Sequence, residues 1–182
     1  MSDNRHILVV SGAPGVGKTV LMQRLAAQYQ GWRLAGFVSG AVVDEGIRSG
    51  FYLQSLGGER HRVAQRGFLS PLSVGHYGVD VARLERCVAA WLPTDAPVDL
   101  TLIDEVGKLE CTSPLFCTTV RRLLATPTPL VVTTPLRGRG LIAEIQEHPA
   151  SLVVRINALN RDALYASIQG RVDEMLTQAR GD

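Results

Sequence analysis

Short apolar runs alternate with segments of helical spacing along most of the chain, and this alternation begins close to the N-terminus. Residues 6–11 (HILVVS) form an apolar run of the length expected for a buried strand. The run leads into a glycine-rich segment, after which Val20, Leu21 and Leu25 recur at helical spacing. The first elements predicted are therefore a strand, a loop and a helix.

The next part of the chain has the pattern of antiparallel strands. Residues 34–39 and 51–56 are predicted strands. The sequence AVVDEGIRSG lies between them, and its glycines, Gly46 and Gly50, favour a hairpin turn. Residues 60–65 are expected to add a short third strand. The pattern thus predicts a β-hairpin insertion after the second strand.

From residue 79 onward helices and strands alternate to the C-terminus. Pro93 is expected to end the first helix of this part, Ser113 followed by Pro114 begins the second, and Asn160 caps the last. The predicted helices cover residues 79–92, 113–125, 141–147 and the segment after 160, and the predicted strands cover residues 99–104, 130–134 and 152–156. Such alternation predicts an α/β fold of three layers, a mainly parallel sheet with helices on both faces, which binds ligands at the carboxyl ends of its strands.

Composition narrows the class of protein without adding chemistry. The chain has 182 residues, of which 46% are hydrophobic and 20% charged, so we expect one globular domain over residues 1–182 and no membrane span. The N-terminal residues run directly into the first strand pattern, which favours a cytoplasmic protein without a cleavable signal. The net charge is only +2 and the arginines are scattered, so the sequence offers no clear nucleic-acid surface.

The glycine-rich segment carries the strongest chemical signal. Its sequence, GAPGVGKT, satisfies the pattern G-x-x-x-x-G-K-[ST] between a predicted strand and a predicted helix. Backbone N–H groups of such a loop wrap a polyphosphate, Lys18 is expected to bridge the β- and γ-phosphates, and Thr19 to ligate magnesium. A glycine-rich structural turn is the alternative, but it would not need Lys-Thr at these positions. The predicted nucleotide-binding residues are Gly12, Ala13, Pro14, Gly15, Val16, Gly17, Lys18, Thr19 and Val20.

A second motif supplies the other half of a magnesium site. The apolar strand 100–103 ends in Asp104, the arrangement that holds Mg²⁺ beside the loop threonine. Glu105 follows directly, and a second carboxylate there can polarise an attacking water, which favours hydrolysis over transfer. The alternative for Glu105 is a solvated surface carboxylate or a residue at a helix start.

A further cation is expected to stabilise charge on the transferred phosphoryl group. Arg48, Arg137 and Arg139 lie on predicted loops and are the candidates, with Arg48 and Arg137 assigned as catalytic. The stretch TTPLRGRG would place Thr133 or Thr134 near the γ-phosphate. Solvated arginines in a surface loop are the alternative, and the sequence does not single out one arginine.

The order of several motifs resembles that of the thermostable nucleoside-triphosphatase family, whose animal members are called cancer-related nucleoside triphosphatases. These motifs are GAPGVGKT, GF at Gly36–Phe37, IRSGF, VGHYGVDV, LIDEVGKLE, VVTTPLR and NRDAL. The resemblance implies a RecA- or AAA-like P-loop NTPase fold and magnesium-dependent hydrolysis of ATP, GTP and other nucleoside triphosphates to diphosphates and phosphate. By position it implies Asp104 as the magnesium residue and Glu105 as the base.

Two parts of the resemblance do not assign a role to a residue. Lys108 and Glu110 fall inside the same motif as Glu105, without a role that the sequence can assign. Gly40, Ala41 and Val43 replace acidic and basic residues that the family has after its first GF.

Two other functions remain open from the sequence. A small-molecule or nucleotide kinase shares the phosphate loop and often has an arginine-bearing lid, here RGRG. A nucleotide-dependent binding module would instead be read by a protein or RNA partner. The expected ligand in every case is a nucleoside triphosphate with Mg²⁺, and the preferred base is not determined.

Overall fold

A single mixed sheet runs through the structure, a computed structural model that describes residues 5–181. Within these residues the sheet has nine strands in the order β5-β6-β4-β3-β2-β7-β8-β1-β9. The strands are β1 Ile7–Gly12, β2 Leu34–Asp44, β3 Ile47–Ser55, β4 Arg60–Arg66, β5 Ser73–Val74, β6 Tyr77–Val79, β7 Leu100–Ile103, β8 Leu130–Thr134 and β9 Ser151–Ile156. The helices are α1 Lys18–Gln28, α2 Val81–Trp91, α3 Pro114–Leu124, α4 Leu141–Glu147 and α5 Arg161–Gly181, with a 3-10 turn, η1, at Glu110–Thr112.

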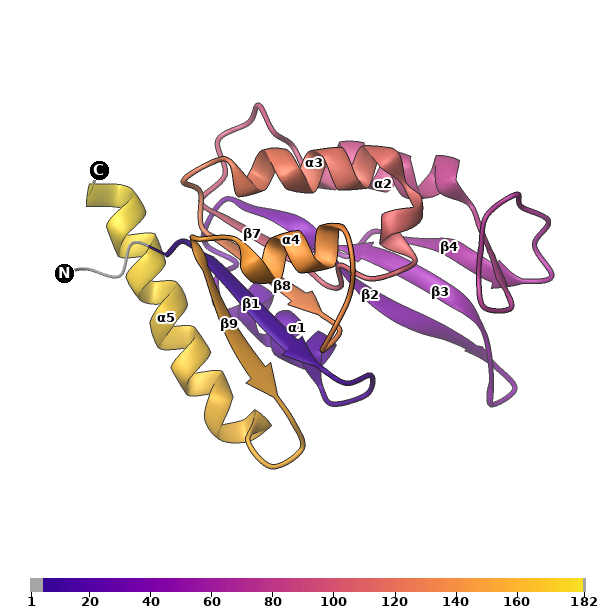
Figure 1. Cartoon of the computed structure of the whole chain (residues 1–182), viewed down its shortest axis with the longest axis horizontal. Coiled ribbons are helices and arrows are strands. Elements are labelled where there is room, and N and C mark those ends of the chain that lie inside the picture. Colours follow the sequence, from indigo (N-terminus) through magenta and orange to yellow (C-terminus); the bar gives the residue numbers. More distant parts are fainter. Residues whose placement is uncertain (1–4, 182) are drawn as a thin grey trace.

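The sheet has a parallel part and an antiparallel part. The five strands β2, β7, β8, β1 and β9 are all parallel to one another. The strands β3, β4, β6 and β5 continue the sheet in antiparallel fashion and extend to the right of the molecule in Figure 1. The α/β fold with a mostly parallel central sheet is confirmed, and the hairpin insertion forms its antiparallel extension.

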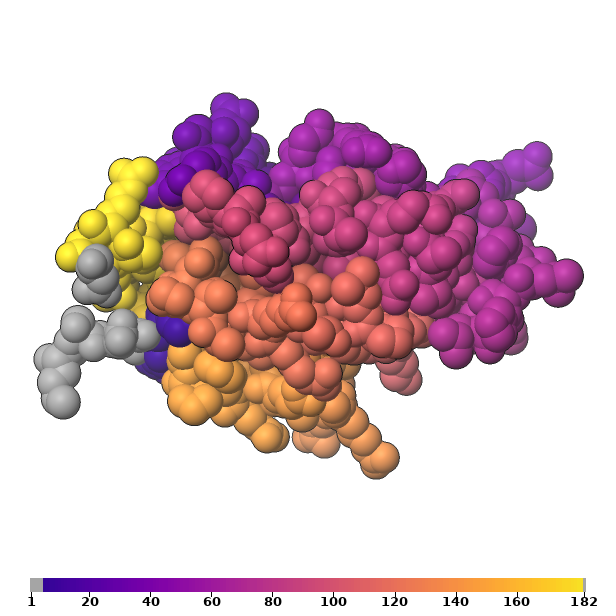
Figure 2. Space-filling view, turned by 90° about the horizontal axis from the view of Figure 1, so that it is seen from above, coloured from indigo at the N-terminus to yellow at the C-terminus, as the bar shows by residue number. Residues whose placement is uncertain are grey.

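Helices cover both faces of the parallel part. On one face α2, α3 and α4 pack through residues such as Leu84, Phe116 and Ile145. On the other face α1 and α5 pack through residues such as Met22 and Val172. In Figure 2 the colours of α2 and α3 spread over the upper face between the yellow C-terminal helix and the purple antiparallel strands. The central strands β1, β7 and β8 are therefore buried on both faces, as their continuous apolar sequences require, whereas the edge strand β9 stays partly exposed.

The hairpin differs from its prediction because strand structure replaces most of the expected turn. The strands β2 and β3 pair from Phe37↔Ser55 to Asp44↔Ile47, so the turn contains only Glu45 and Gly46, both with positive φ. Gly50 lies inside β3, where a Cβ atom would come within 2.3 Å of the carbonyl oxygen of Ala64 on β4. This glycine permits close approach of two strands and does not mark a turn.

One helix start and one side-chain cap differ from the prediction. The helix predicted from residue 79 begins at Val81, because Val79 belongs to β6 and the side chain of Asp80 accepts a hydrogen bond from Arg83 N–H at the N-cap. Asn160 directly precedes α5, but its side-chain oxygen accepts from the N–H of Asn157 in the preceding turn. The N-cap role of Ser113 is confirmed by its 3.0 Å bond from Phe116 N–H.

No helix among the described residues is long and apolar enough to cross a membrane.

Candidate active site

The glycine-rich loop connects the end of β1 to the start of α1. Gly15 has φ 75° and Gly17 has φ 108°, backbone conformations that residues with a Cβ atom rarely adopt. Gly17 is the residue before the helix, so α1 begins at Lys18 with its free N–H groups directed toward the loop. A helix N-terminus preceded by such a loop is a site for a phosphate group.

The residues predicted to bind nucleotide divide into two groups. Pro14, Gly15, Gly17, Lys18, Thr19 and Val20 line a cleft of about 1230 Å³. Val16 is half-buried and packs against the core between the sheet and helices α1 and α5. Gly12 and Ala13 contribute their carbonyl groups to the loop, as the contacts of Lys18 show. The residues of the second group therefore contribute to the shape of the loop through backbone carbonyls and packing and do not line the cleft.

Lys18 is held at the floor of this cleft by three acceptors. Its Nζ donates to the carbonyl oxygens of Gly12 at 2.8 Å and Ala13 at 3.1 Å, and it lies 3.1 Å from Oε2 of Glu105. The side chain is only 6% exposed. The ammonium group has three donors, so these contacts use all of them, and a phosphate oxygen entering the loop would replace one acceptor.

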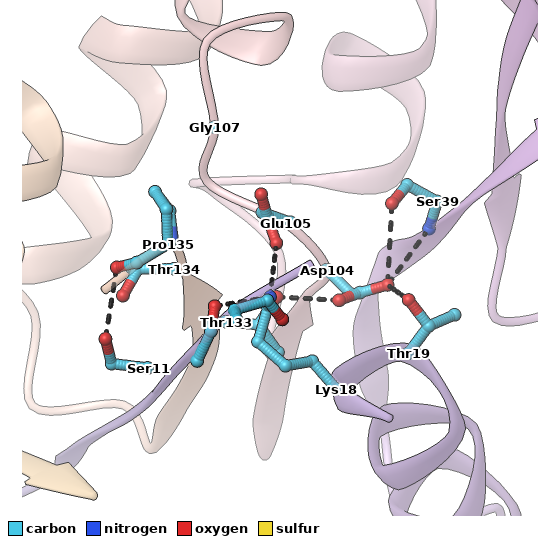
Figure 3. A network of polar contacts seen from close by, with 12 residues as sticks. Ser11, Lys18, Thr19, Ser39, Asp104, Glu105, Gly107, Thr133, Thr134 and Pro135 are labelled. Carbon is cyan, nitrogen blue, oxygen red and sulfur yellow. Dashed lines mark hydrogen bonds and ion pairs between the residues drawn. The ribbon is translucent and has the colours of Figure 1, made fainter. Parts of the chain in front are cut away.

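Asp104 is the centre of a hydroxyl network drawn from four segments of the chain (Figure 3). Thr19 donates to its Oδ2 at 2.7 Å, and Thr133 donates to its Oδ1 at 2.6 Å. Ser39, two residues beyond the last β2 residue paired with β7, contacts Oδ2 through its N–H at 3.4 Å and its hydroxyl at 3.5 Å. The strand order explains this meeting, because β7 lies between β2 and β8.

Burial sets the electrostatics of Asp104. The residue is 1% exposed, and this desolvation raises the pKa of its carboxyl group above the usual range. The hydrogen bonds from Thr133, Thr19 and Ser39 and the charge of Lys18 act in the opposite direction. A buried carboxylate of this kind gains most from a cation placed against it.

The oxygens of Thr19 and Asp104 fit the requirements of Mg²⁺. Magnesium prefers hard oxygen ligands and is commonly held by one or two protein groups together with substrate phosphates and waters. The Thr19 hydroxyl and the Asp104 carboxylate already lie at hydrogen-bond distance from each other beside the phosphate loop. Among residues 5–181 there is no cluster of three His, Cys, Asp or Glu side chains that could hold a metal without such a substrate.

Glu105 lies between the phosphate loop and the segment that follows β7. Its Oε2 contacts Lys18, and Figure 3 shows the side chain between that lysine and the backbone at Gly107. The side chain is 32% exposed. Glu105 is therefore partly buried, paired with Lys18 and accessible from the cleft.

The arginines named from the sequence line the same cleft. Arg48 was predicted to lie on a loop but belongs to β3, because the hairpin strands extend into the expected turn, and its guanidinium carbon is 5.5 Å from the centre of the Phe51 ring. Arg137 and Arg139 lie on the exposed loop between β8 and α4. The structure thus brings Lys18, Glu105, Arg48 and Arg137 to one cleft, and their roles stay predictions.

Sequence reasoning missed Ser39 and left Glu110 without a role. The signal for Ser39 was its position at the end of an apolar strand, which is where a parallel sheet places binding residues. Thr133 and Thr134 also differ from each other, since Thr133 bonds Asp104 whereas Thr134 accepts from the side-chain amide of Gln146 on α4. Of the two threonines, only Thr133 belongs to the network around Asp104.

The phosphate loop follows β1, and the strand that ends in a carboxylate is β7; the single strand β8 lies between them in a parallel sheet covered by helices on both faces. This arrangement defines an α/β protein of the P-loop class. A family profile described as NTPase matches residues 7–169. The chain belongs to this NTPase family, which confirms the resemblance seen in its motifs.

Relatives are similar over nearly the whole chain. Nucleoside-triphosphatase THEP1 of Methanopyrus kandleri is 32% identical over 178 residues, which cover 95% of this chain and 98% of the relative. The crystal structure of THEP1 from the hyperthermophile Aquifex aeolicus matches with a TM-score of 0.80 at 29% identity, covering 89% of this chain and 96% of that one. The solution structure of a human cancer-related nucleoside triphosphatase matches with a TM-score of 0.76 at 32% identity, covering 92% and 97%.

Proposed function

We propose that this protein is a magnesium-dependent nucleoside triphosphatase that hydrolyses ATP, GTP and other nucleoside triphosphates to the diphosphate and phosphate. The observation that carries the proposal is the position of Glu105, one residue after Asp104 and 3.1 Å from the loop lysine. Its relatives are named nucleoside-triphosphatases, which supports the same reaction.

The reaction follows from the placement of these side chains. The oxygen of an attacking water bonds to the γ-phosphorus, and the bond from that phosphorus to the oxygen bridging the β-phosphate breaks. Glu105 accepts a proton of the water and passes it to the released phosphate. Lys18 and a cleft arginine oppose the negative charge on the phosphoryl oxygens. Mg²⁺, held by Thr19 and Asp104, would neutralise charge on the β- and γ-phosphate oxygens.

The substitution Glu105→Gln tests this proposal because it removes the base and keeps the size of the side chain. We expect the release of phosphate from ATP and GTP to fall by about 10²- to 10⁴-fold. Nucleotide affinity, measured with a fluorescent nucleoside diphosphate, should change little because Lys18 and the loop remain. Glu59→Gln is the matched control, since Glu59 directly precedes β4, is 64% exposed and pairs with His61. Undiminished turnover by Glu105→Gln would remove the assigned base.

Phosphoryl transfer is a second candidate function, because Arg137 and Arg139 line the cleft from the loop between β8 and α4, as the arginines of a kinase lid would. Beyond the phosphate loop the cleft continues along apolar side chains that include Phe51, Leu53 and Leu109. A kinase would show diphosphate release that accelerates on addition of an acceptor, whereas a hydrolase would show the same rate with and without a panel of small alcohols and nucleosides.

A further inference from the structure

Glu110 is a buried acid in the cleft that the reaction above does not use. It begins the 3-10 turn η1, is only 6% exposed, and lines the cleft together with Glu105. Its Oε2 accepts a 3.2 Å hydrogen bond from the N–H of Gly107. Burying a carboxyl group is costly unless the group is neutral or well paired, so its position calls for a physical reason.

The geometry around Gly107 brings Glu110 close to Glu105. A Cβ atom built on Gly107 would lie 3.0 Å from Oε1 of Glu105 and 3.1 Å from Oε2 of Glu110. These two oxygens are therefore no more than about 6 Å apart, a span that one water with two hydrogen bonds can bridge. The absence of a side chain at Gly107 leaves this space to the two carboxyl groups.

The two oxygens of Glu105 consequently have different surroundings. Oε2 contacts Lys18 at the phosphate loop, whereas Oε1 lies on the side of Gly107 and Glu110. A carboxylate held at both oxygens has a fixed plane. A carboxylate held by Lys18 alone can turn toward solvent, and the side chain of Glu105 is 32% exposed.

The surroundings of Glu110 favour its neutral form. Burial raises the pKa of its carboxyl group to about 8, and the negative charges of Glu105 and Asp104 act in the same direction. The N–H groups of Glu110 and Gly107 act against this shift. On the α3 side the cleft is lined by Cys111, Cys117 and Arg121. Burial raises the pKa of Cys111 to about 12, and Arg121 is paired with Glu144. Lys108 and the loop arginines also line the cleft.

We propose that Glu110 is a positioning residue for Glu105, to whose Oε1 it donates a hydrogen bond directly or through one water. Glu110 then fixes the plane of the base from the side opposite Lys18. Ionised Glu110 would lack the donor and would repel Glu105 across a short buried distance. The inference rests on the proposed hydrolysis, because it assigns Glu105 as the base.

Two variants of Glu110 separate this role from a merely structural one. Glu110→Gln keeps the size of the side chain and offers an N–H₂ donor to Oε1 of Glu105, at the cost of the hydrogen bond that Oε2 accepts from the Gly107 N–H. Glu110→Leu has a similar size but no donor. Phosphate release from ATP should be measured for both between pH 6 and pH 10, with nucleotide affinity and the thermal midpoint as controls.

We expect Glu110→Leu to lower kcat by about 10- to 100-fold with little change in KM, since only the orientation of the base is lost. Glu110→Gln should keep kcat within about threefold of the wild type at pH 7. The wild-type kcat should decline above about pH 8, where Glu110 ionises, and this decline should be absent in Glu110→Gln. Gly107→Ala, which fills the space between the carboxyl groups, should resemble Glu110→Leu.

Two results would overturn the inference. One is a kcat of Glu110→Leu equal to that of the wild type, and the other is a decline of the kcat of Glu110→Gln at alkaline pH as large as that of the wild type. The second result decides the question even if Glu110→Leu does not fold. A wild-type protein that releases no phosphate would instead contradict the proposed function. Wild-type turnover that depends on Glu105 but not on Glu110 would contradict only the positioning role.

Discussion

The hydroxyl of Thr19 donates a 2.7 Å hydrogen bond to Oδ2 of Asp104, joining the first turn of α1 to the end of β7 across 85 residues of sequence. If these two oxygens hold Mg²⁺, Thr19→Val should raise the magnesium concentration needed for half-maximal phosphate release by about tenfold or more. Asp104→Asn should have a larger effect, because it also removes the negative charge. Titrations of activity with MgCl₂ after treatment with EDTA measure both.

Thr118→Val provides the control for that titration. Thr118 is an exposed residue of α3, so its hydroxyl can be removed without touching the cleft. Its magnesium dependence should equal that of the wild type. Activity that persists in EDTA, or an unchanged magnesium requirement in Asp104→Asn, would contradict the assignment of the metal site.

The cleft arginines should differ in their contribution to turnover. Arg137 follows β8, the strand that brings Thr133 to Asp104, whereas Arg48 lies against Phe51 on the antiparallel extension. We expect Arg137→Ala to lower kcat by about 10²- to 10³-fold and Arg48→Ala to lower it less. Steady-state kinetics of both variants and of Arg139→Ala measure this order. Arg122→Ala, at an exposed residue of α3, is the control. Equal kcat values for Arg137→Ala and Arg122→Ala would exclude Arg137.

Glu110 should also make the stability of the protein depend on pH. Its folded-state pKa of about 8 lies above the usual value of a glutamate, so the folded state binds more protons than the unfolded state between about pH 4.5 and pH 8. Its stabilising contribution is complete below that window and is lost as the pH rises through it, by roughly 1.4 kcal/mol per pH unit at most. Chemical denaturation of wild type and Glu110→Gln should therefore give similar stabilities near pH 4 and a more stable variant at pH 8. If the free energies of unfolding of the wild type and Glu110→Gln changed in parallel with pH across this range, the raised pKa of Glu110 would be contradicted.

Gly36 is expected to be essential for the fold and not for the chemistry. It has φ +125°, and a Cβ atom there would come within 1.8 Å of the carbonyl oxygen of Leu102 on the neighbouring strand β7. Gly36→Ala should destabilise the protein by about 3 kcal/mol or more, because a backbone atom cannot move aside as a side chain can. Gly31→Ala is the matched control, since nothing lies within 4 Å of its Cβ position. Similar thermal midpoints for the two variants would contradict this account.

Local pattern was sufficient for the elements of the parallel sheet and for the phosphate loop. The apolar run before GAPGVGKT and the helical spacing after it predicted β1 and α1 correctly within a residue, because both signals depend on neighbouring positions. The hairpin was less well predicted. Gly50 looks like a turn residue in the sequence, and only its contact with Ala64 on another strand shows why a glycine is needed there.

A loop lysine, a loop threonine and the strand-end pair Asp104–Glu105 can be read from the sequence alone, in the order that phosphate chemistry requires. Which further groups meet them depends on how the strands and helices pack. Ser39 and Thr133 reach Asp104 because β2 and β8 flank β7, and Glu110 lies near Glu105 with only the small residue Gly107 beside both carboxyl groups. Strand order and packing bring together residues far apart in the sequence, and no local pattern records those distances.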